Sequence, residues 1–357
     1  CNSISLALDQ ENNPHISIYD GINRQMIYTS RDAAGWHNQI VVADVLEGFI
    51  DSTSLDLDAA GAPYIFYSGT NQGLRTYYWT PDGWNFHVVD TVGNIWEYSM
   101  VLDENEYPHF SYFKKSESSY SVNYTYKDMA GWNTVLVEEV GDSNIHQPLL
   151  ALDQQGQPHI IYKKETLKYV YKDNAGWNFL DLPASGSDVL SFVLDEMDHA
   201  HITYYENPSQ TDEIENGDST YYEFGSLIYA VYDTFRWHTI SVAECLWIGG
   251  PFPGLTCHGG ALALDSQGYP HIAFLRSQTI EYAHQDSSGW HNLSLGFAFD
   301  ASRAFLKLDE HDFPHIGYQQ NQAIKYAYQD SQGWHPETAA EHGELLSLVL
   351  DSDGHPH

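Results

Sequence analysis

One motif recurs along the whole chain, and it limits the fold more than any other feature of the sequence. A segment of the type Leu-Ala-Leu-Asp, a polar turn and a segment of the type Pro-His-Ile return from the first residues to the last. Such a period is typical of a repeat architecture, in which each unit buries its apolar face against its neighbours. The aspartates follow one another at intervals of 42 to 50 residues, apart from one interval of 70, and are Asp9, Asp58, Asp103, Asp153, Asp195, Asp265, Asp309 and Asp351.

Each repeat contains four short segments, A to D, in which apolar and polar residues alternate with the period of a half-buried strand. Segment A ends at the aspartate and segment B begins at Pro-His. Segment C carries a tyrosine, at Tyr28, Tyr124, Tyr169, Tyr229, Tyr282 and Tyr326. Segment D opens with a tryptophan, at Trp36, Trp84, Trp132, Trp177, Trp237, Trp290 and Trp334. Four strands in each repeat predict the blades of a β-propeller. A solenoid is the main rival, but tight turns such as 265–268 join antiparallel strands, whereas solenoid coils are usually parallel.

We therefore expect one all-β domain over residues 1–357, a propeller of four-stranded antiparallel blades. Residues 347–357 begin a further A-to-B hairpin, so we favour eight blades over seven. The seven complete repeats span about 4–51, 52–98, 99–148, 149–190, 191–260, 261–303 and 304–346.

The repeat that runs from Leu150-Ala151-Leu152-Asp153 through Pro158-His159-Ile160 to Tyr169 and Gly176-Trp177 resembles those of the sialidase-like (BNR-type) propellers of bacterial surface and secreted proteins. The resemblance covers nearly the whole chain and implies a propeller fold. It implies little about activity, because that group mixes glycosidases, polysaccharide lyases, lectins and proteins without known activity. The Asp-box of true sialidases, Ser-x-Asp-x-Gly-x-x-Trp, has no match here.

Charge and cysteine content restrict the partners and the compartment. Lys and Arg number 15 against 49 Asp and Glu, and the formal charge of −34 opposes binding to nucleic acid or anionic membranes. No run approaches the roughly 20 apolar residues of a membrane-spanning helix. Cys245 and Cys257 flank a Gly/Pro-rich segment and are either bonded or two free thiols; a disulfide would indicate a secreted or cell-surface protein. Cys1 would suit the lipid anchor of a processed lipoprotein.

Residues that recur in almost every repeat are interpreted as scaffold. The histidines after proline are expected to pack and to hydrogen-bond a neighbouring turn, not to bind a metal, and the tryptophans of segment D to fill the cores between blades. Residues 351–354 resemble the start of a calcium loop but lack its later ligands, so a plain hairpin is favoured. We expect no metal and no cofactor; Ca²⁺ is the alternative that this resemblance leaves open.

Function is expected where the repeats differ. Because strands alternate in direction, A-to-B and C-to-D turns share one face, and B-to-C and D-to-A connections share the other. Two large insertions of the fifth repeat, 206–226 and 243–260, both fall on the second face. We expect ligand contacts there from Trp96, Tyr98, Tyr221, Trp247, His258 and Arg303. A positive spot is also expected there from Lys114, Lys115, Lys163 and Lys164.

Three functions remain open. The favoured one is an extracellular or cell-surface module that binds a glycan or a surface protein. The second is a carbohydrate-active enzyme on the same face, similar to a polysaccharide lyase, with His146, Tyr98, His258 and Arg303 as acid, base and charge-neutralising groups. The third is a purely structural role. No pair of carboxylates suited to glycoside hydrolysis stands out at positions that do not repeat.

Overall fold

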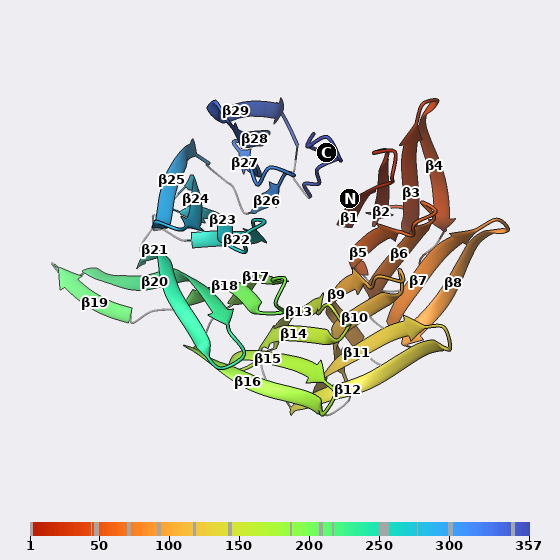
Figure 1. The fold of residues 1–357 in the computed structure, drawn as a ribbon, viewed down its shortest axis with the longest axis horizontal. Helices are drawn as coiled ribbons and strands as arrows, with labels where there is room; N and C mark the ends of the chain where they lie inside the picture. The colour runs from red at the N-terminus through yellow and green to blue at the C-terminus, as the bar shows by residue number, and fades with distance from the viewer. Residues whose placement is uncertain are drawn as a thin grey trace.

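The computed structural model describes residues 3–357 except 44, 46–49, 70–72, 91–93, 117–118, 142–144, 186–187, 207–209, 216–217, 250–256, 277, 299–302 and 344–346. The described residues form 29 strands in seven antiparallel sheets, and no helix among them could span a membrane. Figure 1 shows the sheets following one another around a common axis. The fold is therefore a β-propeller.

The strands of the first four blades have these bounds. Blade 1 contains β1 (Ser3–Leu8), β2 (Pro14–Asp20), β3 (Gln25–Asp32) and β4 (Gly35–Val42). Blade 2 contains β5 (Ile50–Leu57), β6 (Pro63–Gly69), β7 (Gly73–Thr80) and β8 (Gly83–Asp90). Blade 3 contains β9 (Asn94–Leu102), β10 (Pro108–Lys115), β11 (Tyr120–Asp128) and β12 (Gly131–Gly141). Blade 4 contains β13 (His146–Leu152), β14 (Pro158–Lys163), β15 (Thr166–Asp173) and β16 (Gly176–Ser185).

Three further blades follow. Blade 5 contains β17 (Asp188–Leu194), β18 (Ala200–Glu206), an inserted β19 (Gln210–Glu215), β20 (Asp218–Tyr232) and β21 (Trp237–Gly249). Blade 6 contains β22 (Cys257–Leu264), β23 (Pro270–Arg276), β24 (Thr279–Asp286) and β25 (Gly289–Phe297). Blade 7 contains β26 (Ala304–Leu308), β27 (Pro314–Gln320), β28 (Ala323–Asp330) and β29 (Gly333–Ala340). The four expected segments A to D thus become the four strands of each blade in chain order, with A innermost (Figure 1).

The expectation of eight blades is wrong: the molecule has seven. Residues 347–357 form only a short hairpin, held by backbone hydrogen bonds between Val349 and His357 of 2.9 and 3.2 Å. This hairpin supplies no third or fourth strand, and so it does not make a blade. It lies between blades 7 and 1 in Figure 1, where Ser352 exchanges hydrogen bonds of 2.7 and 3.2 Å with Asn12.

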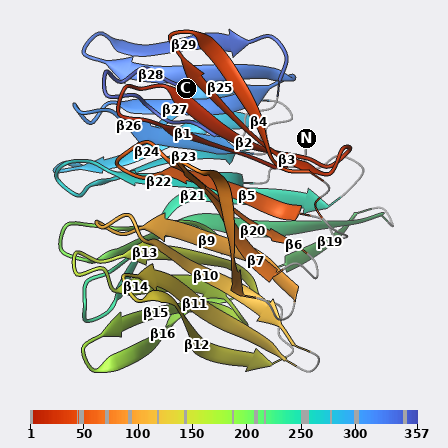
Figure 2. The same ribbon diagram turned by 90° about the vertical axis from the view of Figure 1, so that its right-hand side faces the viewer.

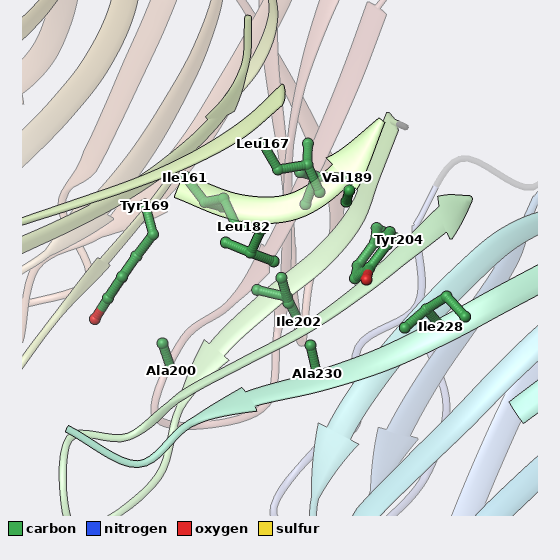
Figure 3. Packing of buried hydrophobic residues seen from close by; sticks show 11 residues of the cluster. Ile161, Leu167, Tyr169, Leu182, Val189, Ala200, Ile202, Tyr204, Ile228 and Ala230 are labelled. Carbon is green, nitrogen blue, oxygen red and sulfur yellow. The ribbon is translucent and has the colours of Figure 1, made fainter. Parts of the chain in front are cut away.

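The cores lie between successive blades. Figure 3 shows one of them, where Ile161 and Leu182 of blade 4 face Ile202 and Ala230 of blade 5. At the edge of five such cores, the strand-D tryptophan of one blade stands edge-on to the strand-C tyrosine of the blade before. The ring centroids lie 5.1 to 5.9 Å apart in the pairs Tyr28–Trp84, Tyr124–Trp177, Tyr169–Trp237, Tyr229–Trp290 and Tyr282–Trp334.

These contacts confirm the predicted role of the tryptophans. Trp36 of blade 1 is the exception, with 52% of its surface exposed.

Candidate binding surfaces

A chain of contacts among an aspartate, a histidine and a tyrosine anchors the first three strands of six blades; the histidine–tyrosine link is a hydrogen bond in all six, and the aspartate–histidine link is one in blades 1 and 5. In blade 4, the Nδ1 atom of His159 lies 2.5 Å from the Tyr169 hydroxyl oxygen, and its Nε2 atom lies 3.6 Å from Asp153 Oδ2. Asp153 Oδ1 in turn accepts backbone N–H groups of the A-to-B turn. The histidine therefore links strand C to that turn, as predicted. The other such sets are Asp9–His15–Tyr28, Asp103–His109–Tyr124, Asp195–His201–Tyr229, Asp265–His271–Tyr282 and Asp309–His315–Tyr326.

Burial sets the direction of these hydrogen bonds. It lowers the pKa of the imidazole below 6.5, here in His109, His159, His201, His271 and His315. It also raises the pKa of the partner tyrosine, to about 12 in Tyr28. A neutral imidazole and a protonated phenol leave one arrangement, in which the tyrosine O–H donates to Nδ1 and Nε2–H faces the aspartate. Nδ1 is thus engaged by the tyrosine, and Nε2 lies 3.3 to 3.7 Å from the aspartate in these sets.

The two faces of the ring carry the connections between strands that strand direction predicts. One cleft brings together the A-to-B turns of blades 4 and 5, with Gln155 and Met197, and their C-to-D turns, with Asn174 and Thr234. These two classes of turn therefore share a face, which we call the turn face. The opposite face, with the B-to-C and D-to-A connections, is called the insertion face.

The two insertions of the fifth repeat pair with each other. Strand β20 begins well before the ordinary strand C of a blade, and its early part pairs with β19 on one side and with the end of β21 on the other. The pairs with β21 run from Tyr221 opposite Gly249 to Ser226 opposite Glu244. The two insertions thus extend blade 5 as one three-stranded ribbon, defined here as residues 210–215, 218–226 and 243–249. In Figure 2, β19 and the adjoining part of β20 extend at the right-hand side of the ring.

A disulfide fastens this ribbon to the next blade. Cys245 in β21 is bonded to Cys257 at the start of β22, with their Cα atoms 5.7 Å apart. Both cysteines are buried, in a core that they share with Leu227 and Phe274. The predicted disulfide is therefore confirmed, and it is compatible with an extracellular protein. Cys1, considered above as a lipid anchor, lies outside the described residues.

The residues predicted to contact a ligand are only partly described. Tyr221 and Trp247 belong to ribbon strands, Trp96 to β9, His146 to β13 and His258 to β22, but their side chains lie outside the described part. Arg303 is exposed, and its Cα lies 3.9 Å from where a Cβ on Gly259 would stand, so its backbone passes beside the start of β22.

Tyr98 lies between blades 2 and 3, where its hydroxyl donates to the carbonyl oxygen of Phe66 at 3.2 Å. The ligand contacts of these six residues and of His146 stay predictions.

The charge of the predicted positive spot is partly neutralised, because two of its four lysines form ion pairs across blade boundaries. Lys114 Nζ lies 2.8 Å from Asp90 Oδ2, and Lys164 Nζ lies 3.1 Å from Glu138 Oε1. Lys115 lies over the ring of Tyr120, 5.1 Å from its centroid. Sequence reasoning missed these pairs because their carboxylates come from strand D of the preceding blade.

Two hollows among the described residues lie on the turn face, although its turns are short and uniform in length. One of about 610 Å³ is lined by the A-to-B turns of blades 3 to 5, including Glu104 and Glu196. Another, of about 340 Å³, lies between blades 4 and 5 and includes Met197 and Tyr232. These hollows lie on the face opposite the ribbon, and whether the two insertions border a pocket of their own stays a prediction, because many side chains of residues 206–226 and 243–260 lie outside the described part. Sequence reasoning missed these hollows because the turn lengths hardly vary. The signal that could have found them is a change of residue type at fixed positions of the repeat.

Three carboxylate and imidazole groups on the last hairpin, Asp351, Asp353 and His355, place ligand atoms within 4.8 Å of one another. Asp351 Oδ1 accepts the backbone N–H groups of Asp353 and His355, as the anchoring aspartates do in other repeats. The cluster is accounted for by the hairpin itself.

Comparison with known proteins supports the fold and leaves the family open. No family model matches the sequence, and no curated protein matches it, so membership of the BNR-type group is not shown. Among solved structures, the chain is similar to the Dos1 propeller (TM-score 0.55, 6% identity, 99% of this chain and 87% of that chain). It is also similar to the polysaccharide lyase Uly1 (TM-score 0.50, 9% identity, 92% and 86%). A puromycin hydrolase matches as well (TM-score 0.55, 11% identity), and this chain covers 56% of it. At these identities the likeness is one of fold alone.

Proposed function

We propose that this protein is a non-catalytic binding module, extracellular or exposed at the cell surface, that recognises a glycan through its insertion face. The observation that carries the proposal is the ribbon of blade 5. A propeller blade needs four strands, and blade 5 adds a fifth together with extensions of two others. The other six blades close the ring with four strands each, so the inserted strand β19 is not needed to complete the fold.

The construction of the ribbon suits a binding platform. Its strands are paired on both sides of β20, and the disulfide ties its outer strand to blade 6. A platform that is ordered before binding loses little conformational entropy when a ligand arrives. The sequence places Tyr221 and Trp247 on this platform, and aromatic rings of this kind can pack against the C–H groups of a sugar.

A lyase is the second candidate, and one observation weighs against it. Tyr98, which would supply its phenol as acid or base, lies in the interface between blades and donates its hydroxyl to Phe66. To reach a substrate, this hydroxyl would have to leave a partly buried hydrogen bond to a backbone carbonyl, which costs about 1–3 kcal/mol when the group left behind is buried.

The test compares the intact chain with a shortened variant on a glycan array. Glu206 and Ser226 face each other across β18 and β20, so a two-residue turn can replace residues 207–225. We expect this variant and Trp247→Ala to lose glycan binding while the thermal midpoint stays close to that of the intact chain. Equal binding by the shortened variant, or release of unsaturated uronates from polyuronic substrates by the intact chain, would overturn the proposal.

A further inference from the structure

Blade 5 departs from the repeat on the turn face as well as on the insertion face. Two positions after the anchoring aspartate it carries Met197, where other repeats have Glu11, Ala60, Asn105, Gln155, Gln267, His311 and Asp353. Three positions after the strand-C tyrosine it carries Tyr232, where other blades have a cation, glutamine or tryptophan. Its C-to-D turn has Arg236 in place of the glycine that precedes the tryptophan elsewhere, and Thr234 in that turn takes a positive φ of 71°.

These substitutions meet in the cleft of about 340 Å³ between blades 4 and 5, a volume within the range of small-ligand sites. One wall is a ladder of rings in which Tyr171 stacks on His159 and Tyr169, with centroids 5.5 Å apart in both pairs. The opposite wall is Tyr232, whose ring lies 5.8 Å from that of Tyr169. Its hydroxyl donates to the carbonyl oxygen of Thr234 at 3.1 Å. Met197, 69% exposed, stands at the mouth.

The boundary between blades 2 and 3 shows what this position does elsewhere. There strand C of blade 3 carries Lys127, whose Nζ atom lies 5.8 Å from the centroid of Tyr64 and 6.0 Å from that of Tyr78. Tyr78 occupies the register position that Tyr171 has in blade 4. A lysine of the molecule itself thus covers the aromatic wall between blades 2 and 3. Between blades 4 and 5, Tyr232 occupies the position of that lysine. The cleft there is therefore lined by aromatic rings on both sides.

The residues that line the cleft indicate which class of ligand it would bind. Its apolar surface comes from tyrosine rings and a thioether, and its rim offers amides at Gln155 and Asn174. A pyranose ring combines an apolar C–H face with hydroxyl groups in this way. Asp153, Asp173 and Asp198 face the cleft with one cation, Lys172, so an anionic sugar is disfavoured.

We propose a second binding site on the turn face, between blades 4 and 5, for a neutral pyranose residue. This site lies on the face opposite the ribbon and is independent of the function proposed for that surface.

The test uses methyl-¹³C methionine NMR with methyl glycosides of glucose, galactose, mannose, fucose and N-acetylglucosamine. The chain has four methionines, Met26, Met100, Met129 and Met197. At least one glycoside should shift the Met197 signal in a saturable way, while Met129, 93% exposed on the C-to-D turn of blade 3, stays unmoved. Methyl glucuronide should bind more weakly than methyl glucoside.

Variants that restore the repeat residues make the test specific. Tyr232→Lys places in blade 5 the residue type of Lys127 and Lys172, so the fold should tolerate it. It should weaken binding at least about tenfold, as expected from the loss of about 1.4 kcal/mol of ring contact. Met197→Gln, followed by saturation-transfer NMR on the sugar, should also weaken it. Gln329→Lys, which introduces lysine at the equivalent position of blade 7, and the ribbon-shortened variant should bind as the intact chain does. The proposal is overturned if no glycoside shifts Met197, if both restoring variants bind unchanged, or if the glucuronide binds as tightly as the glucoside.

Discussion

A buried polar side chain in a repeat protein must find its partners within its own unit or the next one. Blade 2 is the one blade without the aspartate–histidine–tyrosine contacts, and it lacks both the histidine and the tyrosine. Tyr64 stands where other blades have the histidine, and Thr76 occupies the register position of the strand-C tyrosine. A histidine retained beside Thr76 would have a buried ring nitrogen without the phenol, a loss of about 1–3 kcal/mol. The joint substitution avoids an unpaired imidazole, although the buried Thr76 hydroxyl has no hydrogen-bond partner among the described residues.

Acid should destabilise the protein through these histidines. Their pKa in the folded state lies below 6.5 in five blades, so the unfolded chain takes up protons first as the pH falls. The stabilisation is complete above pH 6.5 and is lost as the pH falls toward the lowered pKa values. We therefore expect the free energy of unfolding in urea to decrease steadily from pH 7 to 5. A constant or rising value over this range would contradict the assignment of neutral imidazoles.

The tryptophans of strand D should differ sharply in what they contribute to stability. Trp177 packs on Tyr124 of the preceding blade, whereas Trp36 is 52% exposed. Trp177→Ala should cost about 3 kcal/mol of the free energy of unfolding, the lower end of the usual range for a large aromatic in a core, because the ring is partly buried. Trp36→Ala serves as the matched control and should cost far less. Denaturant titration of both variants measures the difference, and equal losses would show that the exposed ring of Trp36 contributes as much as a packed one.

At the scale of strands, the sequence predicted what repeats and missed what pairs across repeats. Alternation and the Asp, Pro-His and Trp positions placed four strands in each blade, because each of those residues has its main partners inside one repeat. The number of blades could not be read in this way, since residues 347–357 carry only the first half of the motif. The two insertions were correctly expected on the same face, but the strand pairing between residues 218–226 and 243–249 was not predicted, because both segments read as loops when taken singly. Met197 and Tyr232 were overlooked for a different reason: they change chemistry without changing loop length.

The disulfide should stabilise the ribbon more than the ring. It joins residues 12 positions apart, and closing a loop of about this length is worth about 3 kcal/mol in the chain-entropy model. In a Cys245→Ser/Cys257→Ser variant we expect faster hydrogen exchange at the outer end of β21, with exchange in blades 3 and 4 unchanged. Cys1→Ser is the control and should leave all rates as they are. Acceleration spread evenly over the seven blades would mean that the bond closes the whole ring.

At the scale of the molecule, each blade contacts the blades next to it in the chain, as the units of a repeat protein do. An A-to-B turn often contacts the turn of the next blade. Gln154 N donates to Asp198 Oδ1 at 3.0 Å, and Ser266 N donates to Asp312 Oδ1 at 2.9 Å. The hairpin 347–357 makes the same contact with blade 1, because Ser352 N donates to Asn12 Oδ1 at 3.2 Å. The seam between blades 7 and 1 therefore keeps the turn contact, while no aromatic ring among the described residues packs on Trp36 as it does on the tryptophans of five other boundaries.

This asymmetry predicts where the ring opens first. Backbone amides of blade 1 should exchange faster than those of blade 4, because among the described strands β1 and β2 pack against β5 of blade 2, while the hairpin contacts blade 1 at the seam through hydrogen bonds to Asn12. Asn12→Gly removes the seam hydrogen bonds and keeps a backbone suited to its positive φ of 63°, as Gly61 and Gly156 do at this position. We expect it to accelerate exchange in blade 1 about fivefold, the effect of losing about 1 kcal/mol of surface hydrogen bonding.

Asp198→Gly, which removes the equivalent contact between blades 4 and 5, is the matched control. Asp198 has a φ of 62°, so its backbone responds to glycine as that of Asn12 does. Its effect should stay within blades 4 and 5, which are also held by the shared core of Ile161, Ile202 and Ala230. Hydrogen exchange in blade 1 should therefore be faster in the Asn12→Gly variant and unchanged in the Asp198→Gly variant. If the two variants accelerate blade 1 equally, or if blade 4 exchanges as fast as blade 1 in the unmodified chain, the seam is not the weakest boundary of the ring.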